Sequence, residues 1–541
     1  MPRGYHLPEP SDVADPWAGF EWDLPAEYNV AAECLDAGDS ADEALRHVGV
    51  DGERTALTYG ELRAATDATA ARFATAGVDP GDRVGLCLPQ SPELLVAHLA
   101  TFAVGAVSVP LSMLLGDASL RSTAARADVS LVVCDAQRRA ALDGEFAAES
   151  LVVETGARTA PLFGLDAHVT AGDTVDRPAT TPDDPALVLF TSGSTGDPKG
   201  VVVGHSYLAG SLPGNQCWYQ LFDAAEARAA RIYTPAEWAW AGALFDVVFP
   251  TLALGGTVVS HERRSGFDPD RALGLIASEG VTHAYFPPTA LRRMRAEVDP
   301  AAHDLSALVA VQSGGEALPD GVQSWAERAL GAVINEGYGQ TEANAIAGEC
   351  RAAYPPRDGS LGRPYPGHDV VVVDEDGAEL PPGEVGELVV RPPDPVLFSG
   401  YLDDPAATDA AFTDEGWLRT GDAVERDADG YLYHRGRLDD VIITSGYRVS
   451  PTEVEDALST HPAVAAAVVG GVPDADRGQR VVACVVPADD ATADDDLAAT
   501  LTATVADAIG PHKRPREVRF LDAIPETRNG KADRAALFGE E

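Results

Sequence analysis

Residues 189–200 of this 541-residue chain read LFTSGSTGDPKG, and they continue an apolar run, residues 186–190, that predicts a buried strand. Small hydroxylated residues and glycines leave backbone N–H groups open to an anion, and Lys199 adds a positive charge. The stretch therefore predicts a phosphate-binding loop after a strand. Its candidate ligands are Thr191, Ser192, Gly193, Ser194, Thr195, Gly196 and Lys199.

This loop differs from the Walker phosphate loop in two ways. Pro198 stands where that motif has a glycine before its lysine, and the valines at 201–203 follow where a helix would begin. A flexible surface turn is the alternative for residues 191–193 taken alone, but it does not account for all twelve residues. We therefore expect a phosphate loop of another kind.

Outward from the loop, the chain has an α/β pattern. The runs 83–90 and 131–136 predict buried strands, residues 93–103 predict a helix, and the alternation continues to about residue 350. Between about 360 and 435, Asp-Gly and Pro-Pro-Gly turns separate β-branched runs, which indicates a β-rich subdomain. The rest, with a capped helix start at residues 450–453 and strands at 463–472 and 480–487, predicts a small α+β domain.

The composition is that of a highly acidic, globular protein. The net charge is −45, and only three of the 40 basic residues are lysines, namely Lys199, Lys513 and Lys531. Such a surface disfavours nucleic acid and is typical of a cytoplasm kept at molar salt, so we expect a halophilic, cytoplasmic protein. No apolar run is long enough for a membrane span, and the six scattered cysteines predict buried small residues and not a metal site.

Five further motifs follow the loop in order. They are Gly314-Gly315-Glu316, Tyr338-Gly339-Gln340-Thr341-Glu342, residues 416–422, residues 436–440 with Ser445-Gly446-Tyr447-Arg448, and Asn529-Gly530-Lys531. The set resembles the adenylate-forming enzymes (acyl-CoA synthetases, peptide-synthetase adenylation domains and firefly-type luciferases) over nearly the whole chain. Trp240 and the 338–342 motif are most similar to the short- and medium-chain acyl-CoA synthetases. The resemblance implies an α/β body over residues 1–436, with two α/β sheets and a β-rich subdomain, and a small mobile α+β domain over 437–541.

The resemblance also implies roles for single residues. Lys531 would stabilise the pentavalent phosphorus formed from ATP, Glu342 would be the Mg²⁺ carboxylate, and Thr341 would lie beside the α-phosphate. Asp422 and Arg437 would contact the ribose, although alone Asp422 could be a turn residue. The other implied nucleotide-binding residues are Gly314, Gly315, Glu316, Glu336, Gly337, Tyr338, Gly339, Gln340 and Arg448.

For the second half-reaction, the resemblance implies a rotation of the small domain. Asp439 would be the hinge, and Ser445, Gly446 and Tyr447 would line the route of the CoA pantetheine. A loop glycine with a positive φ is the alternative for Gly446.

Trp240, Ala241, Gly242 and Gly339 form the implied acyl pocket. Gly339 stands where acetate-specific relatives have a second tryptophan, so we expect space for more than two carbons. Core packing is the alternative for Trp240, because Trp238 lies two residues away.

The sequence thus predicts an ATP-dependent acid:CoA ligase of fatty acid metabolism, which joins a short- to medium-chain acid first to AMP and then to CoA. Two alternatives stay open: an enzyme that loads the pantetheine of a carrier protein, and a non-catalytic nucleotide- or acyl-binding protein. The expected partners are the acid, ATP with Mg²⁺, and CoA; the oligomeric state is left open, a homodimer included.

Overall fold

The structure is a computed structural model of the whole chain. It describes Leu7, Trp17 and residues 19–142, 149–153, 177–191, 198–263, 266–318, 320–438, 440–444, 447–474, 477–488, 491–525 and 532–539. The chain forms two compact units, one of Met1–Asp369 with Arg391–Leu418 and the other of Val370–Val390 with Arg419–Glu541. The sequence predicted a boundary after residue 436, where a mobile domain would begin. The two compact units follow from internal packing and do not test mobility, so this boundary stays a prediction.

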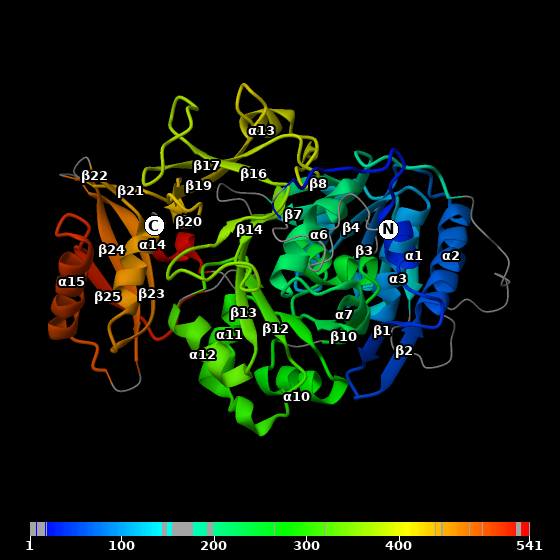
Figure 1. The fold of residues 1–541 in the computed structure, drawn as a ribbon, viewed down its shortest axis with the longest axis horizontal. Coiled ribbons are helices and arrows are strands. Elements are labelled where there is room, and N and C mark those ends of the chain that lie inside the picture. The colour runs from blue at the N-terminus through cyan, green and yellow to red at the C-terminus, as the bar shows by residue number, and fades with distance from the viewer. Residues whose placement is uncertain are drawn as a thin grey trace. The chain divides into compact units, whose positions relative to one another are not determined.

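The described part of the first unit contains two large mixed sheets (Figure 1). One has nine strands in the order β15-β14-β13-β12-β11-β9-β10-β1-β2, in which β1 and β9–β13 are parallel neighbours. Its strands are β1 Glu43–Val48, β2 Arg54–Thr58, β9 Arg231–Tyr233, β10 Thr257–His261, β11 His283–Tyr285, β12 Ala310–Gly314, β13 Val333–Gln340, β14 Ala343–Gly348 and β15 Arg363–Pro364.

The second sheet has seven strands among the described residues, in the order β18-β8-β7-β4-β3-β5-β6. They are β3 Arg83–Cys87, β4 Val107–Pro110, β5 Leu131–Asp135, β6 Glu149–Val153, β7 Pro185–Thr191, β8 Lys199–Gly204 and β18 Gly400–Tyr401. The strands predicted at 83–90 and 131–136 are β3 and β5, so the α/β fold class is confirmed.

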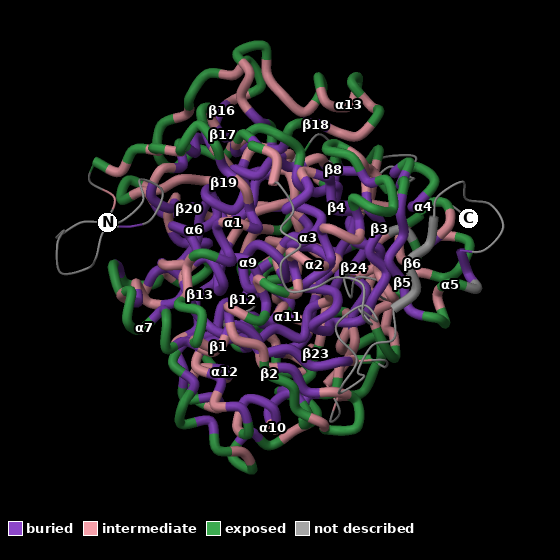
Figure 2. The backbone as a smooth tube through the Cα atoms, turned by 90° about the vertical axis from the view of Figure 1, so that its right-hand side faces the viewer, coloured by how far each residue is buried: buried purple, intermediate pink, exposed green. Residues whose placement is uncertain are grey.

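Helices pack on both sheets. Their bounds are α1 Val30–Asp36, α2 Tyr59–Thr75, α3 Pro92–Ala103, α4 Asp117–Arg126, α5 Ala136–Leu142, α6 Ser206–Trp218, α7 Ala224–Ala229, α8 Ala241–Ala243, the π-helix η1 Leu244–Val248, α9 Phe249–Ala253, α10 Pro269–Glu279, α11 Pro288–Glu297, the 3₁₀ helix η2 Pro300–Ala302, α12 Asp320–Leu330 and α13 Pro405–Ala410. The predicted helix 93–103 is α3, which Ser91 caps through the N–H of Leu94. Every residue of α3 is buried (Figure 2), including the polar residues Glu93, His98 and Thr101.

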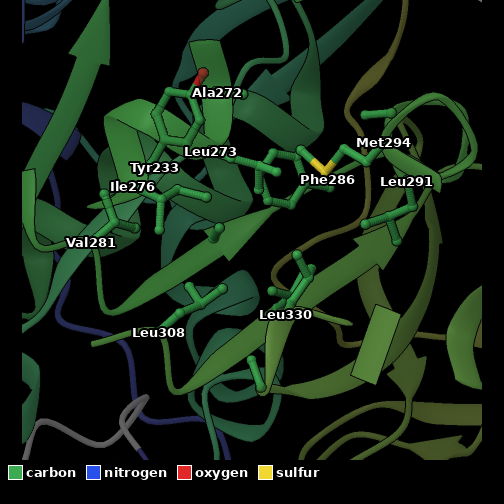
Figure 3. Packing of buried hydrophobic residues seen from close by; sticks show 14 of the residues in the cluster. Tyr233, Ala272, Leu273, Ile276, Val281, Phe286, Leu291, Met294, Leu308 and Leu330 are labelled. Atoms are coloured by element: carbon green, nitrogen blue, oxygen red, sulfur yellow. The ribbon is translucent and has the colours of Figure 1, made fainter. Parts of the chain in front are cut away.

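The two faces of the nine-stranded sheet have different characters. Ala284, Val311 and Ile334 belong to an apolar cluster with α10, α11 and α12, where Phe286, Leu291 and Met294 are among its side chains (Figure 3). Side chains alternate along a strand, so the neighbouring residues Tyr285, Gln312 and Asn335 lie on the opposite face, which is the face of the site described below.

The second unit contains, in its described part, a four-stranded sheet of order β16-β17-β19-β20 and a five-stranded sheet in which β22-β21-β24-β23 are joined by β25. The elements are β16 Asp369–Val373, β17 Val385–Arg391, β19 Leu418–Arg426, β20 Leu432–Arg437, β21 Ile442–Thr444, β22 Tyr447–Val449, α14 Pro451–Ser459, β23 Val464–Asp474, β24 Gly478–Pro487, α15 Asp495–Ile509, β25 Glu517–Phe520 and α16 Arg534–Phe538. The predicted strands at 463–472 and 480–487 are β23 and β24.

The start of α14 was predicted in part. Ser450 accepts the N–H of Glu453, as in a capping box, but the Glu453 carboxylate is held by Lys513, whose Nζ lies 2.6 Å from both oxygens. All six cysteines are buried, as predicted. Among the described helices, none combines the length and the apolar character that a bilayer crossing needs.

Candidate active site

The strands on either side of the predicted phosphate loop are antiparallel neighbours. β7 ends at Thr191 and β8 begins at Lys199, and these two residues are cross-strand partners. Ser192, Gly193, Ser194, Thr195 and Gly196 lie outside the described residues. The chain enters a strand after the loop and not a helix, which confirms that this is not a Walker loop.

Lys199, Tyr401 and Glu342 form a contiguous group at the start of β8, the strand that follows the predicted loop in sequence. The Nζ of Lys199 lies 4.8 Å from the centroid of the Tyr401 ring, a cation–π distance, and the Tyr401 hydroxyl donates to Oε1 of Glu342 at 2.7 Å. The strand β18 brings Tyr401 there, because Tyr401 pairs with Val201 of β8. Sequence reasoning missed Tyr401, since it lies in none of the quoted motifs.

The backbone around Thr341 and Glu342 is fixed from two sides. The buried hydroxyl of Tyr207 donates to the carbonyl of Thr341 at 2.8 Å, and the N–H of Phe398 donates to the carbonyl of Glu342 at 3.0 Å. The described residues contain no group of three or more His, Cys, Asp or Glu that could hold a metal. A single carboxylate fits magnesium, which binds through one or two carboxylates, waters and substrate phosphates and does not need an all-protein cage.

The carboxyl ends of the parallel strands β11, β12 and β13 lie together, which is where open α/β sheets bind ligands. Gly314 ends β12, and a Cβ there would come within 2.7 Å of the Gly337 carbonyl. Gly315 has a φ of +87°, which favours glycine. Both glycines are therefore required by the backbone, and the Tyr285 hydroxyl lies beside them, donating to the carbonyl of Gly314 at 3.0 Å.

Two acidic residues of the nucleotide motifs have protein partners. Glu316 pairs with Arg292 of α11 at 3.0 Å, a partner that the sequence did not indicate. Glu336 is buried, and its Oε1 accepts the N–H of Leu318 at 2.8 Å. Its backbone N–H donates to the carboxylate of Glu349, whose pKa is raised by burial. Glu336 thus fixes the backbone at Leu318, shortly after Gly314-Gly315-Glu316. Tyr338 and Gln340 lie further along β13, at its half-exposed end.

The two tryptophans near the predicted acyl pocket differ in burial. Trp238 is buried, whereas Trp240 and Gly242 are half-exposed, and Ala241 is buried. Core packing therefore describes Trp238, and Trp240 is available to border a pocket.

The interpretation of Gly339 as open pocket space needs correction. A Cβ on Gly339 would come within 2.4 Å of the backbone nitrogen of Ala345 and 3.0 Å of the carbonyl oxygen of Ala343. The neighbouring strand β14 fills the position where a side chain would start. Gly339 therefore allows β13 and β14 to approach each other closely, and the absence of a side chain there does not leave open space for an acyl chain.

Behind Gly242 lies a buried carboxyl group that sequence reasoning also missed. Asp246, on η1, accepts from the side chain of Asn344 through Oδ1 at 2.6 Å. Its Oδ2 lies 3.1 Å from the position that a Cβ on Gly242 would take. Burial raises the pKa of Asp246 to about 8, and hydrogen bonding by Asn344 and Gln312 opposes the rise.

The local fold explains why Asp246 sits there. Pro250 has no N–H to donate to the carbonyl of Asp246, and the Tyr219 hydroxyl donates to it instead, at 3.1 Å. The π turn sends the N–H of Phe249 to Leu244, and Asn215 donates to the carbonyl of Phe245 at 3.0 Å. Asn215 of α6 and Tyr219, which follows α6, thus donate to the two backbone carbonyls that have no hydrogen-bond partner within the irregular helix.

In the second unit, Asp422 and Arg437 are cross-strand partners on β19 and β20. Arg437 Nη1 lies 3.3 Å from Asp422 Oδ1, and His434 Nε2 lies 3.2 Å from the same oxygen. The two predicted ribose ligands are therefore brought together, with His434 as a neighbour that was not predicted.

The remaining predicted residues can be placed only in part. Asp439, Ser445, Gly446 and Lys531 lie outside the described residues, as does the side chain of Arg448, whose backbone is in β22. Tyr447 is exposed, and its ring centroid lies 4.9 Å from that of His512.

Comparison with known proteins identifies the family of the chain. Residues 37–402 match the model of the AMP-binding enzyme family, and residues 453–531 match the AMP-binding enzyme C-terminal domain. The chain is 36% identical to a feruloyl-CoA synthase of Amycolatopsis sp. over 90% of this chain and 94% of that protein, and 32% identical to an acetyl-coenzyme A synthetase of Streptomyces avermitilis over 98% and 86%. Among solved structures, the amide bond synthetase McbA of Marinactinospora thermotolerans matches with a TM-score of 0.82 at 32% identity, over 94% of this chain and 98% of that one.

The chain therefore belongs to the AMP-binding enzyme family. It is an AMP-forming acid–CoA ligase of the adenylate-forming superfamily, as the sequence predicted.

Proposed function

We propose that this enzyme is an ATP-dependent carboxylic acid:CoA ligase for short- to medium-chain acids. An oxygen of the acid's carboxylate attacks the α-phosphorus of ATP, and pyrophosphate leaves. The CoA thiol then loses its proton and attacks the acyl carbonyl, and AMP leaves. The observation that carries the proposal is the group of Lys199, Tyr401 and Glu342, because it sets a cation and a carboxylate beside a loop of phosphate-binding composition.

For the first half-reaction we assign Lys199 and the loop to the phosphates and Lys531 to the charge that develops at phosphorus. Glu342 would hold the magnesium ion, which neutralises phosphate charge when bound, and Thr341 would lie beside the α-phosphate. The implied roles of Asp422 and Arg437 at the ribose, and of Gly314, Gly315, Glu316, Glu336 and Tyr338 at the adenine, stay as proposed.

For the second half-reaction we assign Ser445, Gly446 and Tyr447 to the pantetheine of CoA and Asp439 to the hinge. These assignments rest on the family's order of motifs. The half-exposed Trp240 supports an acyl pocket that opens at Gly242.

The decisive assay varies the acid and the acyl acceptor independently. The enzyme is given a panel from acetate to decanoate, together with aromatic acids because one relative is a feruloyl-CoA synthase. The acceptor is free CoA, a pantetheinylated carrier protein, or a primary amine, the last because McbA is an amide bond synthetase. We expect pyrophosphate, AMP and a thioester in the presence of CoA. Absence of pyrophosphate with every acid, or product only with the carrier or the amine, would overturn the proposal.

A further inference from the structure

A buried polar group lies where the proposed acyl pocket would be expected to be apolar. Gly242 and Asp246 are four residues apart on one helical segment, so they share a face. Helical side chains lean toward the N-terminus, which places the Asp246 carboxyl over Gly242. Gly242 is half-exposed and Asp246 is buried, so the carboxyl lies at the inner side of this face.

Two polar side chains of the nine-stranded sheet, Tyr285 and Gln312, also lie near Gly242 and Asp246. Tyr285 and Gln312 are cross-strand partners on β11 and β12, so their side chains share a face of the sheet. A Cβ on Gly242 would lie 3.4 Å from the Tyr285 hydroxyl oxygen, and a Cβ on Gly315 would lie 3.6 Å from it. The Tyr285 hydroxyl donates to the carbonyl of Gly314 at 3.0 Å and so keeps its own oxygen as an acceptor.

Gln312 has hydrogen-bonding capacity left over. Its side chain is completely buried, and its amide is near enough to Asp246 to favour the charged carboxylate. Its amide nitrogen is the group that can donate to Asp246, whereas its oxygen completes no hydrogen bond among the described residues. Buried polar groups are nearly always satisfied, so an incomplete amide beside a buried carboxyl calls for an external partner.

The backbone next to this group is strained as well. Ala345, which follows Asn344, has a φ of +52°, a conformation that is uncommon for a residue with a side chain. Such outliers collect at ligand sites because the surrounding structure holds them in place. Here the strained residue, Ala345, directly follows Asn344, whose side chain donates a hydrogen bond to Asp246.

We propose that the acid activated by this enzyme carries a hydroxyl group away from its carboxylate, and that Asp246, Tyr285 and Gln312 bind this hydroxyl. This inference rests on the proposed function and narrows its substrate class from plain aliphatic acids to hydroxylated ones. A hydroxyl donates to an ionised Asp246 or accepts from a protonated one, and it can donate to the Tyr285 oxygen. An ammonium group fits less well, because it requires the ionised carboxylate that burial disfavours.

The test uses matched pairs of acids at several lengths, so that it does not depend on the length of the pocket. The pairs are 3-hydroxybutyrate with butyrate, 6-hydroxyhexanoate with hexanoate, and 4-hydroxycinnamate with cinnamate; 6-aminohexanoate is added as the cationic analogue. Pyrophosphate release gives kcat/KM for each acid with the wild-type enzyme. We expect the hydroxylated member of at least one pair to be preferred by about tenfold or more, the direction for a site built to bind a hydroxyl.

The variants assign the preference to the carboxyl. Asp246→Leu should bring the ratio within that pair close to one, and Asp246→Asn should keep part of the preference. Asp394→Asn is the matched control, because Asp394 is another buried carboxyl of the same unit, paired with His368 at 2.7 Å. It should leave the ratio unchanged.

The possible failures are distinguishable. If no acid releases pyrophosphate, the proposed function fails. If both members of every pair react equally with the wild-type enzyme, the hydroxyl site is refuted while the ligase stands, and this outcome needs no variant to fold. Preference for 6-aminohexanoate would replace the hydroxyl with a cation, and an unchanged ratio in Asp246→Leu would refute the role of Asp246.

Discussion

Asn344 Nδ2 lies 2.6 Å from Asp246 Oδ1, and this contact joins the edge of the large sheet to an irregular helix. It is a hydrogen bond to a carboxyl group that burial keeps largely neutral near pH 7. The stability of the protein should therefore depend on pH through Asp246.

Asp246→Asn tests this dependence. The pKa of Asp246 is about 8 in the fold and near 3.8 when unfolded, so between these values the folded state binds the extra proton. The stability due to this group is present at low pH and falls by about 1.4 kcal/mol per pH unit as pH rises toward 8. Tyr207, Tyr219 and Tyr285, which interact with Asp246, have raised pKa values and stay neutral in this range.

The measurement is the difference in free energy of unfolding between Asp246→Asn and wild type at pH 5, 6.5 and 8. The difference should move in favour of the variant as pH rises. A difference that is constant with pH would show that Asp246 titrates normally.

Tyr401→Phe should weaken the use of magnesium while keeping the ring under Lys199. Loss of the hydroxyl removes the 2.7 Å hydrogen bond that orients Glu342. A charged hydrogen bond is worth about 1.5–3 kcal/mol, which corresponds to a loss of roughly tenfold or more. We expect the magnesium concentration for half-maximal pyrophosphate release to rise, and Tyr401→Leu to be worse, because it also removes the cation–π contact. Tyr433→Phe, which removes a hydroxyl in the other unit, is the control; equal effects would contradict a role for Tyr401.

The three lysines should differ in their tolerance of arginine. An ammonium approaches one phosphate oxygen as a compact charge, whereas a guanidinium prefers a bidentate partner. Lys513 already has such a partner, since both oxygens of Glu453 lie 2.6 Å from its Nζ. Lys513→Arg should therefore be mild, and Lys199→Arg and Lys531→Arg should lower kcat/KM for pyrophosphate release. Three equal effects would contradict the assignment.

Lys531→Ala should separate the two half-reactions. Adenylate formation should fall by on the order of 10²-fold or more, the scale for losing a partner of transition-state charge. Thioester formation from supplied acyl-adenylate should stay nearly intact, and an equal loss in both steps would refute the proposed role.

Gly339→Ala should destabilise the whole enzyme and not change its preference for acids. The new Cβ would meet the backbone of Ala345 at 2.4 Å, so β13 or β14 has to move. We expect a fall of roughly 1–3 kcal/mol in the free energy of unfolding, the range for overpacking, with equal proportional losses for short and long acids. A Cβ on Gly274 of α10 would make only an ordinary contact with His303, at 3.8 Å, so Gly274→Ala should be neutral or stabilising. Selective loss of long acids would restore the original interpretation of Gly339.

The charge of the chain predicts a requirement for salt. With 85 acidic and 40 basic residues, the surface repels itself in dilute buffer, and molar KCl reduces the Debye length to about 3 Å. The melting temperature and the activity should both rise as the KCl concentration is increased from about 0.1 M to about 3 M. Maximal stability in dilute buffer would show that the acidic bias has another cause.

The sequence predicted what depends on local pattern. The strands β3 and β5, the helix α3, the hairpin β23–β24 and the family of the enzyme follow from apolar periodicity, turn residues and the order of motifs. Tyr401, Asp246 and Gln312 were missed, because each acquires its role from a partner on a distant segment. Gly339 was misinterpreted because a missing side chain does not reveal what occupies its place.

The π-helix at Leu244–Val248 has an evolutionary consequence. A π turn amounts to one residue inserted into an α-helix. Deletion of the codon for Leu244 or Phe245 would remove this insertion and bring Asp246 from the fourth to the third position after Gly242, a turn of about 100° around the helix axis at 3.6 residues per turn. The Asp246 carboxyl would then leave the face of Gly242, and the apolar Val247 would lie four residues after Gly242 in its place. One in-frame event could therefore convert a polar acyl pocket into an apolar one without altering any residue that meets ATP.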